Sequence, residues 1–185
     1  MTGPSGAGKG TLIKRLLARM PELELAVSAT TREQRVGEED GREYWFISDE
    51  EFDRKRERGE LLEWVVFPWG QRSATLYSEI GRITSQGRVP VLELEPEGAL
   101  RVKRRVAGSI TIFVDAPLSE LERRLRERAT ESAGEIGERL RLAHEQKQQA
   151  VAFDYVVVND DVERAVRELA AIVDGELAGR LSAND

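Results

Sequence analysis

The glycine-rich stretch at the start of the chain constrains the fold more than any other feature. Residues 3–9 read GPSGAGK, the G-x-x-x-x-G-K spacing of a phosphate-binding loop. Glycines let backbone N–H groups turn inward around phosphate oxygens, and the N-terminus of the following helix adds its positive dipole end. Such a loop joins a buried strand to a helix, so it predicts an α/β fold. A glycine-rich turn without a ligand is the alternative, but the spacing, Lys9 and the helical pattern after it favour phosphate binding.

Apolar periodicity along the rest of the chain predicts helices and strands in alternation. We expect helices near 12–20, 48–59, 76–87, 98–105, 119–129 and 161–177, and strands near 23–28, 61–67, 89–95, 109–116 and 155–159. Two helices are expected to begin with capping boxes, Ser48 with Glu51 and Ser119 with Glu122. The alternation implies a parallel central sheet covered on both faces, with ligands at the carboxyl ends of the strands.

Composition narrows the class of protein. A chain of 185 residues predicts one core domain with room for inserted lobes. The formal charge of −6 argues against a sequence-independent nucleic-acid binder, whose affinity rests on neutralising phosphates. The sequence has no Cys, which excludes disulfides and thiolate metal sites. With no apolar run near the length of a membrane helix and no signal-peptide pattern, we expect a cytoplasmic enzyme with no membrane or nucleic-acid partner.

A second polar constellation lies between residues 28 and 46. Arg32 and Arg35 are three positions apart and Tyr44 follows them. Two guanidinium forks and a phenol are suited to gripping a phosphate. A solvated, charged loop is the alternative, and the residues by themselves leave both interpretations open.

This segment resembles the GMP-binding segment of the guanylate kinase family. The shared pattern is S-A-T-T-R-x-x-R-x-G-E-x-x-G-x-x-Y over 28–44. Further stretches resemble the same family in the same order: GELLEW (59–64), GALRVK (98–103), ELERRLRERAT (120–130), IGERL (136–140) and DYVVVND (154–160). The resemblance therefore covers nearly the whole chain.

The resemblance implies a P-loop NTPase three-layer fold that transfers the γ-phosphoryl of ATP to GMP or dGMP with Mg²⁺. It implies a core (1–27, 87–118 and 150–185), a GMP-binding lobe (28–86) and a helical lid (119–149). By matching position, ATP would be bound by Gly3, Pro4, Ser5, Gly6, Ala7, Gly8, Lys9, Gly10, Thr11 and Asn159. GMP would be bound by Ser28, Arg32, Arg35, Tyr44, Glu63, Thr75, Glu93 and Glu95. The catalytic residues would be Lys9, Arg35, Arg124, Arg128 and Arg139.

Guanine selectivity has a physical reason at Glu63. Guanine presents N1–H and an amino group as adjacent donors, and one carboxylate can accept both. Adenine has an acceptor at N1, which would leave the carboxylate facing a lone pair at a cost of about 1–3 kcal/mol or more. A surface carboxylate on a strand is the alternative for Glu63, because Leu62 and Trp64 beside it make an outward polar position natural.

The position that normally ligates Mg²⁺ differs here from that of the usual phosphate-binding loop. Gly10 stands where a Ser or Thr hydroxyl normally ligates Mg²⁺. Thr11 comes one residue later and points about 100° further round the helix. We expect either that Thr11 serves or that the nucleotide phosphates and water hold the ion, with Glu93 as a second candidate, through water.

The stretch GQRSAT (70–75) also departs from the family. Arg72 and Ser73 stand where the family has two tyrosines, and Ala74 replaces a glycine. The second tyrosine of the family helps to bind the GMP phosphate. Our hypothesis is that Arg72 takes over this charge neutralisation while Thr75 keeps the guanine contact. Glu93 and Glu95, where aspartates are commoner, each add a methylene.

Two other functions fit parts of the pattern. One is a kinase for another small phosphorylated acceptor, and the other is a non-catalytic guanylate-kinase-like domain that binds phosphorylated peptides. The intact loop with Lys9 argues against the second.

The start of the chain carries a separate expectation. The loop begins at Gly3, so the buried strand that normally precedes it is missing from this sequence. We expect the natural polypeptide to start upstream. Without that strand, buried backbone groups of its neighbours would lack partners, at about 1–3 kcal/mol each.

Overall fold

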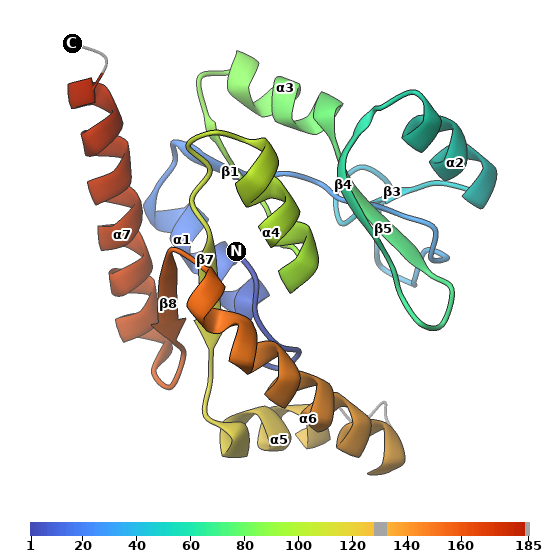
Figure 1. Ribbon diagram of the computed structural model, residues 1–185, viewed down its shortest axis with the longest axis vertical. Helices are drawn as coiled ribbons and strands as arrows, with labels where there is room; N and C mark the ends of the chain where they lie inside the picture. The colour runs from blue at the N-terminus through green and yellow to red at the C-terminus, as the bar shows by residue number, and fades with distance from the viewer. Residues whose placement is uncertain (128–132, 184–185) are drawn as a thin grey trace. The chain divides into compact units, whose positions relative to one another are not determined.

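The computed structural model describes residues 1–127 and 133–183, which Figure 1 shows coloured along the chain. The chain divides into two compact units. Unit 1 comprises Met1–Pro21 and Ile110–Asp185, and unit 2 comprises Glu22–Ser109. The phosphate loop therefore belongs to unit 1 and the segment 28–46 to unit 2. The expected division into core, GMP-binding lobe and lid stays a prediction.

Unit 1 is a parallel strand pair with helices packed around it. Its elements are α1 (Lys9–Arg19), β7 (Ile112–Asp115), α5 (Leu118–Glu127), α6 (Ala133–Gln148), the 3-10 turn η1 (Gln149–Ala152), β8 (Tyr155–Val158) and α7 (Val162–Ala183). β7 and β8 pair in parallel from Ile112 opposite Tyr155 to Asp115 opposite Val158. Helices α1 and α7 lie side by side (Figure 1). The apolar run Ile112–Val114 is wholly buried, as expected for a parallel strand covered on both faces.

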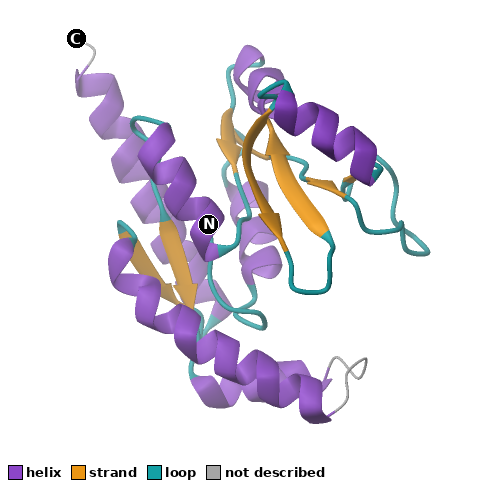
Figure 2. Ribbon diagram, turned by 45° about the vertical axis from the view of Figure 1, so that its right-hand side comes forward, coloured by secondary structure: helices purple, strands orange, loops and turns teal. Residues whose placement is uncertain are grey.

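Unit 2 is built around a β-hairpin. Its elements are β1 (Leu23–Leu25), β2 (Ala29–Thr30), β3 (Trp45–Phe46), α2 (Asp49–Glu57), β4 (Leu61–Val66), β5 (Arg72–Leu76), α3 (Tyr77–Ser85), β6 (Val89–Val91) and α4 (Pro96–Arg105). The antiparallel strands β4 and β5 form the hairpin, which Figure 2 shows as the two long strands. Strand β2 extends this sheet beside β5, and β3 pairs with β2. The core of the sheet packs Phe52 of α2 against Ala29, Leu61, Ala74 and Leu76.

The expected parallel strands are present as two pairs, one in each unit. In unit 2, β1 and β6 pair in parallel from Leu23 opposite Val89 to Leu25 opposite Val91. In unit 1 the pair is β7 with β8. The α/β class and its alternating element order are confirmed, and the hairpin sheet of unit 2 supplies the antiparallel part.

One expected helix start is confirmed and another is wrong. Ser48 caps α2, because its Oγ accepts a hydrogen bond of 3.1 Å from the backbone N of Glu51. Ser119 lies inside α5, which begins at Leu118, so it cannot be the N-cap. The carbonyl of Pro117 accepts the helical hydrogen bond from Leu121 N at 3.0 Å, so the helical bonding already starts before Ser119.

The segment before the loop pairs with β7. Thr2 forms an isolated parallel bridge with Phe113. Its N–H donates to the carbonyl of Ile112 at 2.9 Å, and its carbonyl accepts from Val114 N at 2.7 Å. These bonds give the backbone of β7 partners at Ile112 and Val114, and the buried Thr2 leads directly into the phosphate loop.

α7 is the longest described helix, with 22 residues. Across residues 1–127 and 133–183, no helix combines the length and the apolar character needed to cross a membrane.

Candidate active site

The backbone of the loop in unit 1 requires glycine at several positions. Gly3, Gly6 and Gly8 have φ of +143°, +87° and +83°. A Cβ on Gly3 would overlap the carbonyl oxygen of Val114, and one on Gly8 would lie 2.5 Å from Nδ2 of Asn159. The loop is therefore a close-packed turn whose shape depends on the missing side chains, as a backbone phosphate cradle does.

Lys9 is the first residue of α1 and folds back over the loop. Its Nζ donates to the carbonyls of Gly3 at 2.8 Å and Pro4 at 3.3 Å. Gly10 and Thr11 follow in the exposed first turn, and a Cβ on Gly10 would meet open space. The ammonium thus lies at the loop, and the position that usually carries the magnesium hydroxyl is accessible.

Asn159 and Arg124 hold the loop from outside. Asn159 is 1% exposed, and its Nδ2 donates to the carbonyl of Ala7 at 2.7 Å. Arg124 of α5 donates through Nη1 to Gly6 O at 3.3 Å and through Nη2 to Asn159 O at 3.2 Å. Within the described part of the chain, the buried Oδ1 of Asn159 has no hydrogen-bond partner. The structure thus brings three predicted elements together: the loop, Arg124 and Asn159.

The other two predicted arginines of the lid lie outside this description. Arg128 is outside the described residues, and Arg139 belongs to α6 but its side chain lies outside the description.

Glu63 and Thr75 form a buried polar pair in unit 2. They face each other across β4 and β5, and Thr75 Oγ1 donates to Glu63 Oε1 at 3.0 Å. Glu63 is only 4% exposed, so the alternative of a surface carboxylate is wrong. Burial raises the pKa of Glu63 above its usual value, although the Thr75 hydrogen bond and then the charge of Arg101 oppose this rise.

The helix α4 approaches the same carboxylate closely. A Cβ on Gly98 would lie 2.5 Å from Oε2 of Glu63. Glycine at this position therefore leaves room for the buried carboxylate.

The residues predicted to bind a phosphate, Arg32, Arg35 and Tyr44, differ in how far contacts with other side chains fix their positions. Arg32 forms a two-point ion pair with Glu38, at 2.8 and 2.9 Å, and its guanidinium carbon lies 5.2 Å from the ring centroid of Tyr44. Burial, followed by the charge of Glu93, raises the pKa of Tyr44. A solvated loop is therefore wrong for Arg32 and Tyr44, whereas Arg35 is exposed. The sequence analysis did not predict the ion pair of Glu38 with Arg32, because Glu38 appeared there only as one position of the family pattern.

Arg72 lies on β5 and is engaged by α2. Its Nη1 donates to Asp53 at 2.9 Å, its Nε lies 3.4 Å from Asp49, and its guanidinium carbon is 5.3 Å from the ring centroid of Phe52. The charge of Arg72 is therefore compensated by two carboxylates in this structure.

The remaining predicted residues flank these groups. Ser28 precedes β2, and its carbonyl accepts from Trp45 N at 2.9 Å. Glu95 is the N-cap residue of α4, and Glu93, two residues before it, is exposed. Across the described residues, no group of three or more His, Cys, Asp or Glu side chains could hold a metal ion. A Mg²⁺ ion held mainly by nucleotide phosphates and water suits such a donor set.

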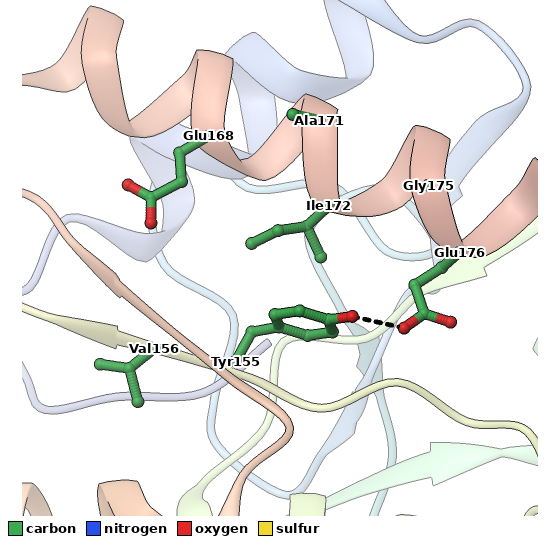
Figure 3. Close-up of a pocket in the computed structure, with 7 residues that line it drawn as sticks. All are labelled: Tyr155, Val156, Glu168, Ala171, Ile172, Gly175 and Glu176. Atoms are coloured by element: carbon green, nitrogen blue, oxygen red, sulfur yellow. Dashed lines mark hydrogen bonds between the residues drawn. The ribbon is translucent and has the colours of Figure 1, made fainter.

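Unit 1 also has a pocket away from these residues, between β8 and α7 (Figure 3). Its lining comprises Tyr155, Val156, Glu168, Ala171, Ile172, Gly175 and Glu176. The hydroxyl of Tyr155 donates to Glu176 at 2.6 Å. No residue that the sequence predicted for nucleotide binding lines this pocket.

Comparison with known proteins decides the family. The guanylate kinase family model matches residues 1–176. This chain belongs to the guanylate kinase family. It is 42% identical over 179 residues to a guanylate kinase of Symbiobacterium thermophilum, covering 96% of this chain and 84% of that protein. It is 45% identical over 170 residues to a guanylate kinase of Synechococcus sp. strain CC9311, covering 91% and 89%.

A solved guanylate kinase structure agrees with this family assignment, and a second kinase shares the fold. The guanylate kinase from Anaplasma phagocytophilum has a TM-score of 0.74 at 27% identity, over 95% of this chain and 84% of that one. Shikimate kinase from Bacteroides thetaiotaomicron has a TM-score of 0.50 at 19% identity, which shows a shared fold alone. The resemblance and the P-loop kinase fold predicted from the sequence are thus confirmed.

Proposed function

We propose that this chain is an ATP:GMP phosphotransferase, which converts GMP, and dGMP as a second acceptor, into the diphosphate with release of ADP. Membership of the guanylate kinase family supports this reaction. The observation that carries the choice of acceptor is the buried pair of Glu63 and Thr75, since a buried carboxylate can accept both donors of guanine.

In unit 1, we assign the ATP phosphates to the loop 3–9 and the first turn of α1. Lys9 would exchange the carbonyls of Gly3 and Pro4 for phosphate oxygens. The unpartnered Oδ1 of Asn159 suits a ligand donor such as the adenine amino group. Arg124, Arg128 and Arg139 are assigned to the charge on the transferring group. Mg²⁺ would neutralise phosphate charge when bound, with Thr11 or water completing its ligands and Glu93 as a further candidate.

In unit 2, we assign the GMP phosphate and base to different groups. Arg32, Arg35 and Tyr44 would hold the phosphate, and Ser28, Glu63 and Thr75 would hold guanine. We also assign Glu93 and Glu95 to the binding of GMP. The acceptor oxygen belongs to a phosphate that is already anionic near neutral pH, so the reaction needs positioning and charge neutralisation more than a general base. The three-part domain division and the cytoplasmic location stay predictions.

A coupled assay of ADP release tests this function. GMP, dGMP, AMP, UMP, dTMP and ribose phosphates are offered with Mg·ATP, and turnover is expected with GMP and dGMP. Preference for another acceptor would favour a different small-molecule kinase. Binding of a phosphopeptide without any ATP turnover would favour the non-catalytic domain.

Glu63→Gln is expected to lower kcat/KM for GMP by about 10- to 100-fold. The amide keeps one acceptor but turns an NH₂ toward a guanine donor, so one hydrogen bond becomes a clash of donors. The measurement is steady-state kinetics with GMP and AMP, with Glu57→Gln at the exposed end of α2 as control. An unchanged preference for GMP over AMP would rule out guanine recognition by Glu63.

Arg72→Ala separates two roles of this arginine. If Arg72 leaves Asp49 and Asp53 to bind the GMP phosphate, we expect KM for GMP to rise about tenfold. This factor corresponds to the free energy of one hydrogen bond to a charged group. If Arg72 only ties β5 to α2, thermal stability falls and KM is unchanged. Kinetics and a melting curve on the same sample distinguish the two results.

A further inference from the structure

We infer that Glu38 is a positioning residue of the GMP phosphate site, because it clamps Arg32 so that one edge of the guanidinium stays available to a ligand phosphate. This inference rests on the proposed function, since it takes Arg32 to be a ligand of the GMP phosphate. Both residues belong to unit 2, in the segment between β2 and β3.

The clamp uses both terminal nitrogens of Arg32. Nη1 donates to Glu38 Oε2 at 2.9 Å, and Nη2 donates to Glu38 Oε1 at 2.8 Å. The two side chains are 15% and 18% exposed, so the pair is mostly shielded from water. A second contact fixes the same end, because Nη1 also donates to the carbonyl of Glu33 at 2.7 Å. The parallel two-point geometry fixes direction as well as distance.

The remaining donors of Arg32 lie along its other edge. A guanidinium has five N–H groups, and these contacts use both on Nη1 and one on Nη2. Among the described residues, Nε–H and the second N–H of Nη2 have no hydrogen-bond partner. These two N–H groups form the side fork of the guanidinium, which matches two oxygens of a phosphate. Glu38 and a phosphate therefore accept hydrogen bonds from different edges of the Arg32 guanidinium and do not compete for the same N–H groups.

Aromatic contacts hold the plane of the guanidinium. Its carbon lies 5.2 Å from the ring centroid of Tyr44 and 5.5 Å from that of Phe46. This packing keeps the guanidinium of Arg32 next to Tyr44, which is itself a proposed phosphate ligand. A cation over an aromatic face is also attracted by the ring.

Glu38 further connects Arg32 to Arg35. Its Oε2 accepts from the backbone N of Arg35 at 2.9 Å, and its own N–H donates to Arg35 O at 3.1 Å. Gly37 makes this turn possible with a φ of +88°. The hydrogen bond from Arg32, followed by that from Arg35 N, holds the pKa of Glu38 below its usual value, so the carboxylate is charged at neutral pH. One carboxylate thus clamps the side chain of Arg32 and also bonds to the backbone of Arg35, without a contact to the Arg35 side chain among the described residues.

The test is Glu38→Gln, with GMP varied at saturating Mg·ATP and ATP varied at saturating GMP. An amide presents one acceptor and one donor, so it cannot accept from both Nη1 and Nη2. We expect KM for GMP to rise about tenfold or more, while kcat and KM for ATP stay within about twofold. Glu39→Gln is the matched control, since Glu39 is the next residue, is exposed and pairs only with Arg42 among the described ion pairs. It is expected to behave as wild type.

Action through Arg32 is tested by a double-mutant cycle. In an Arg32→Ala background, Glu38→Gln is expected to raise KM for GMP by little further, because the residue that it positions is absent. A loss that adds in full to that of Arg32→Ala would show that Glu38 acts in another way and overturn the inference. Glu38→Asp is a second variant, in case Gln unfolds the lobe. It keeps the charge but has one methylene fewer, so its carboxylate does not reach Arg32 from the same backbone position, and the same rise in KM is expected.

The remaining outcomes separate the inference from the proposed function. A wild-type chain that does not phosphorylate GMP overturns the function, and the inference with it. An active wild type with unchanged KM for GMP in both Glu38 variants overturns the inference alone. A lowered KM would do the same, because it would mean that Glu38 competes with the phosphate. Melting temperatures of all variants identify any rise in KM that comes from partial unfolding.

Discussion

Lys9→Met is expected to lower kcat for phosphoryl transfer from ATP to GMP by about 100- to 1000-fold, the usual effect of removing one preorganised donor at developing charge. Methionine keeps the unbranched shape and a similar helix propensity, so α1 should still begin at this position. The charge that would meet the β- and γ-phosphates is lost. Steady-state ADP release at saturating GMP measures the change.

Lys14→Met is the matched control for Lys9, because Lys14 lies on the exposed face of the same helix. It should retain wild-type kcat. In this structure Lys9 also satisfies the carbonyls of Gly3 and Pro4, so a moderate fall in melting temperature is expected as well. A Lys9→Met protein that is folded and turns over at the wild-type rate would remove the loop from the reaction.

Gly3→Ala is expected to lower the free energy of unfolding by about 3–5 kcal/mol, by overpacking and by backbone strain together. The added methyl would overlap the carbonyl oxygen of Val114, which belongs to the buried strand β7. The φ of +143° at this position is also unfavourable for any L side chain. Because Val114 N pairs with Thr2, neither segment can move away without losing a backbone hydrogen bond.

Denaturant unfolding measures this loss, with Gly10→Ala as the comparison. A Cβ on Gly10 meets open space in the first turn of α1, so alanine should stabilise the protein by about 0.5–1 kcal/mol through helix propensity. The same substitution is thus expected to lower the free energy of unfolding at Gly3 and to raise it at Gly10. A Gly3→Ala protein as stable as wild type would mean that the loop does not pack against β7 as described.

Local features of the chain were predictable because short-range physics determines them. The capping of α2 by Ser48 needs only a hydroxyl three residues before a backbone N–H. The left-handed turn at Gly59, with a φ of +69°, needs only the absence of a Cβ. The phosphate loop is equally local, since its glycines and Lys9 occupy consecutive positions. The wrong helix start at Ser119 has the same origin, because a shift of a helix end by two residues leaves the apolar pattern of the helix unchanged.

The side-chain partners could not be predicted from the sequence, because they join residues far apart along the chain. In the sequence, Glu63 stands between two apolar residues, as an outward-facing strand residue would. It is buried only because β4 pairs with β5 and α4 approaches it at Gly98. Asn159 contacts Ala7 across 152 positions of sequence. Arg72 is predicted to bind a phosphate, and its contact with Asp53 of α2 is a partner that the sequence did not indicate.

The sequence by itself therefore indicated the family, through its resemblance to guanylate kinases, and proposed a set of ligand groups by matching position. It also determined the α/β class, because loop spacing and apolar periodicity express local geometry. Only the tertiary structure decided which of those groups are buried and which carboxylate faces each arginine. Burial and charge pairing depend on how separate segments pack, and a carboxylate such as Glu38 gains its partner only when the chain between β2 and β3 has folded.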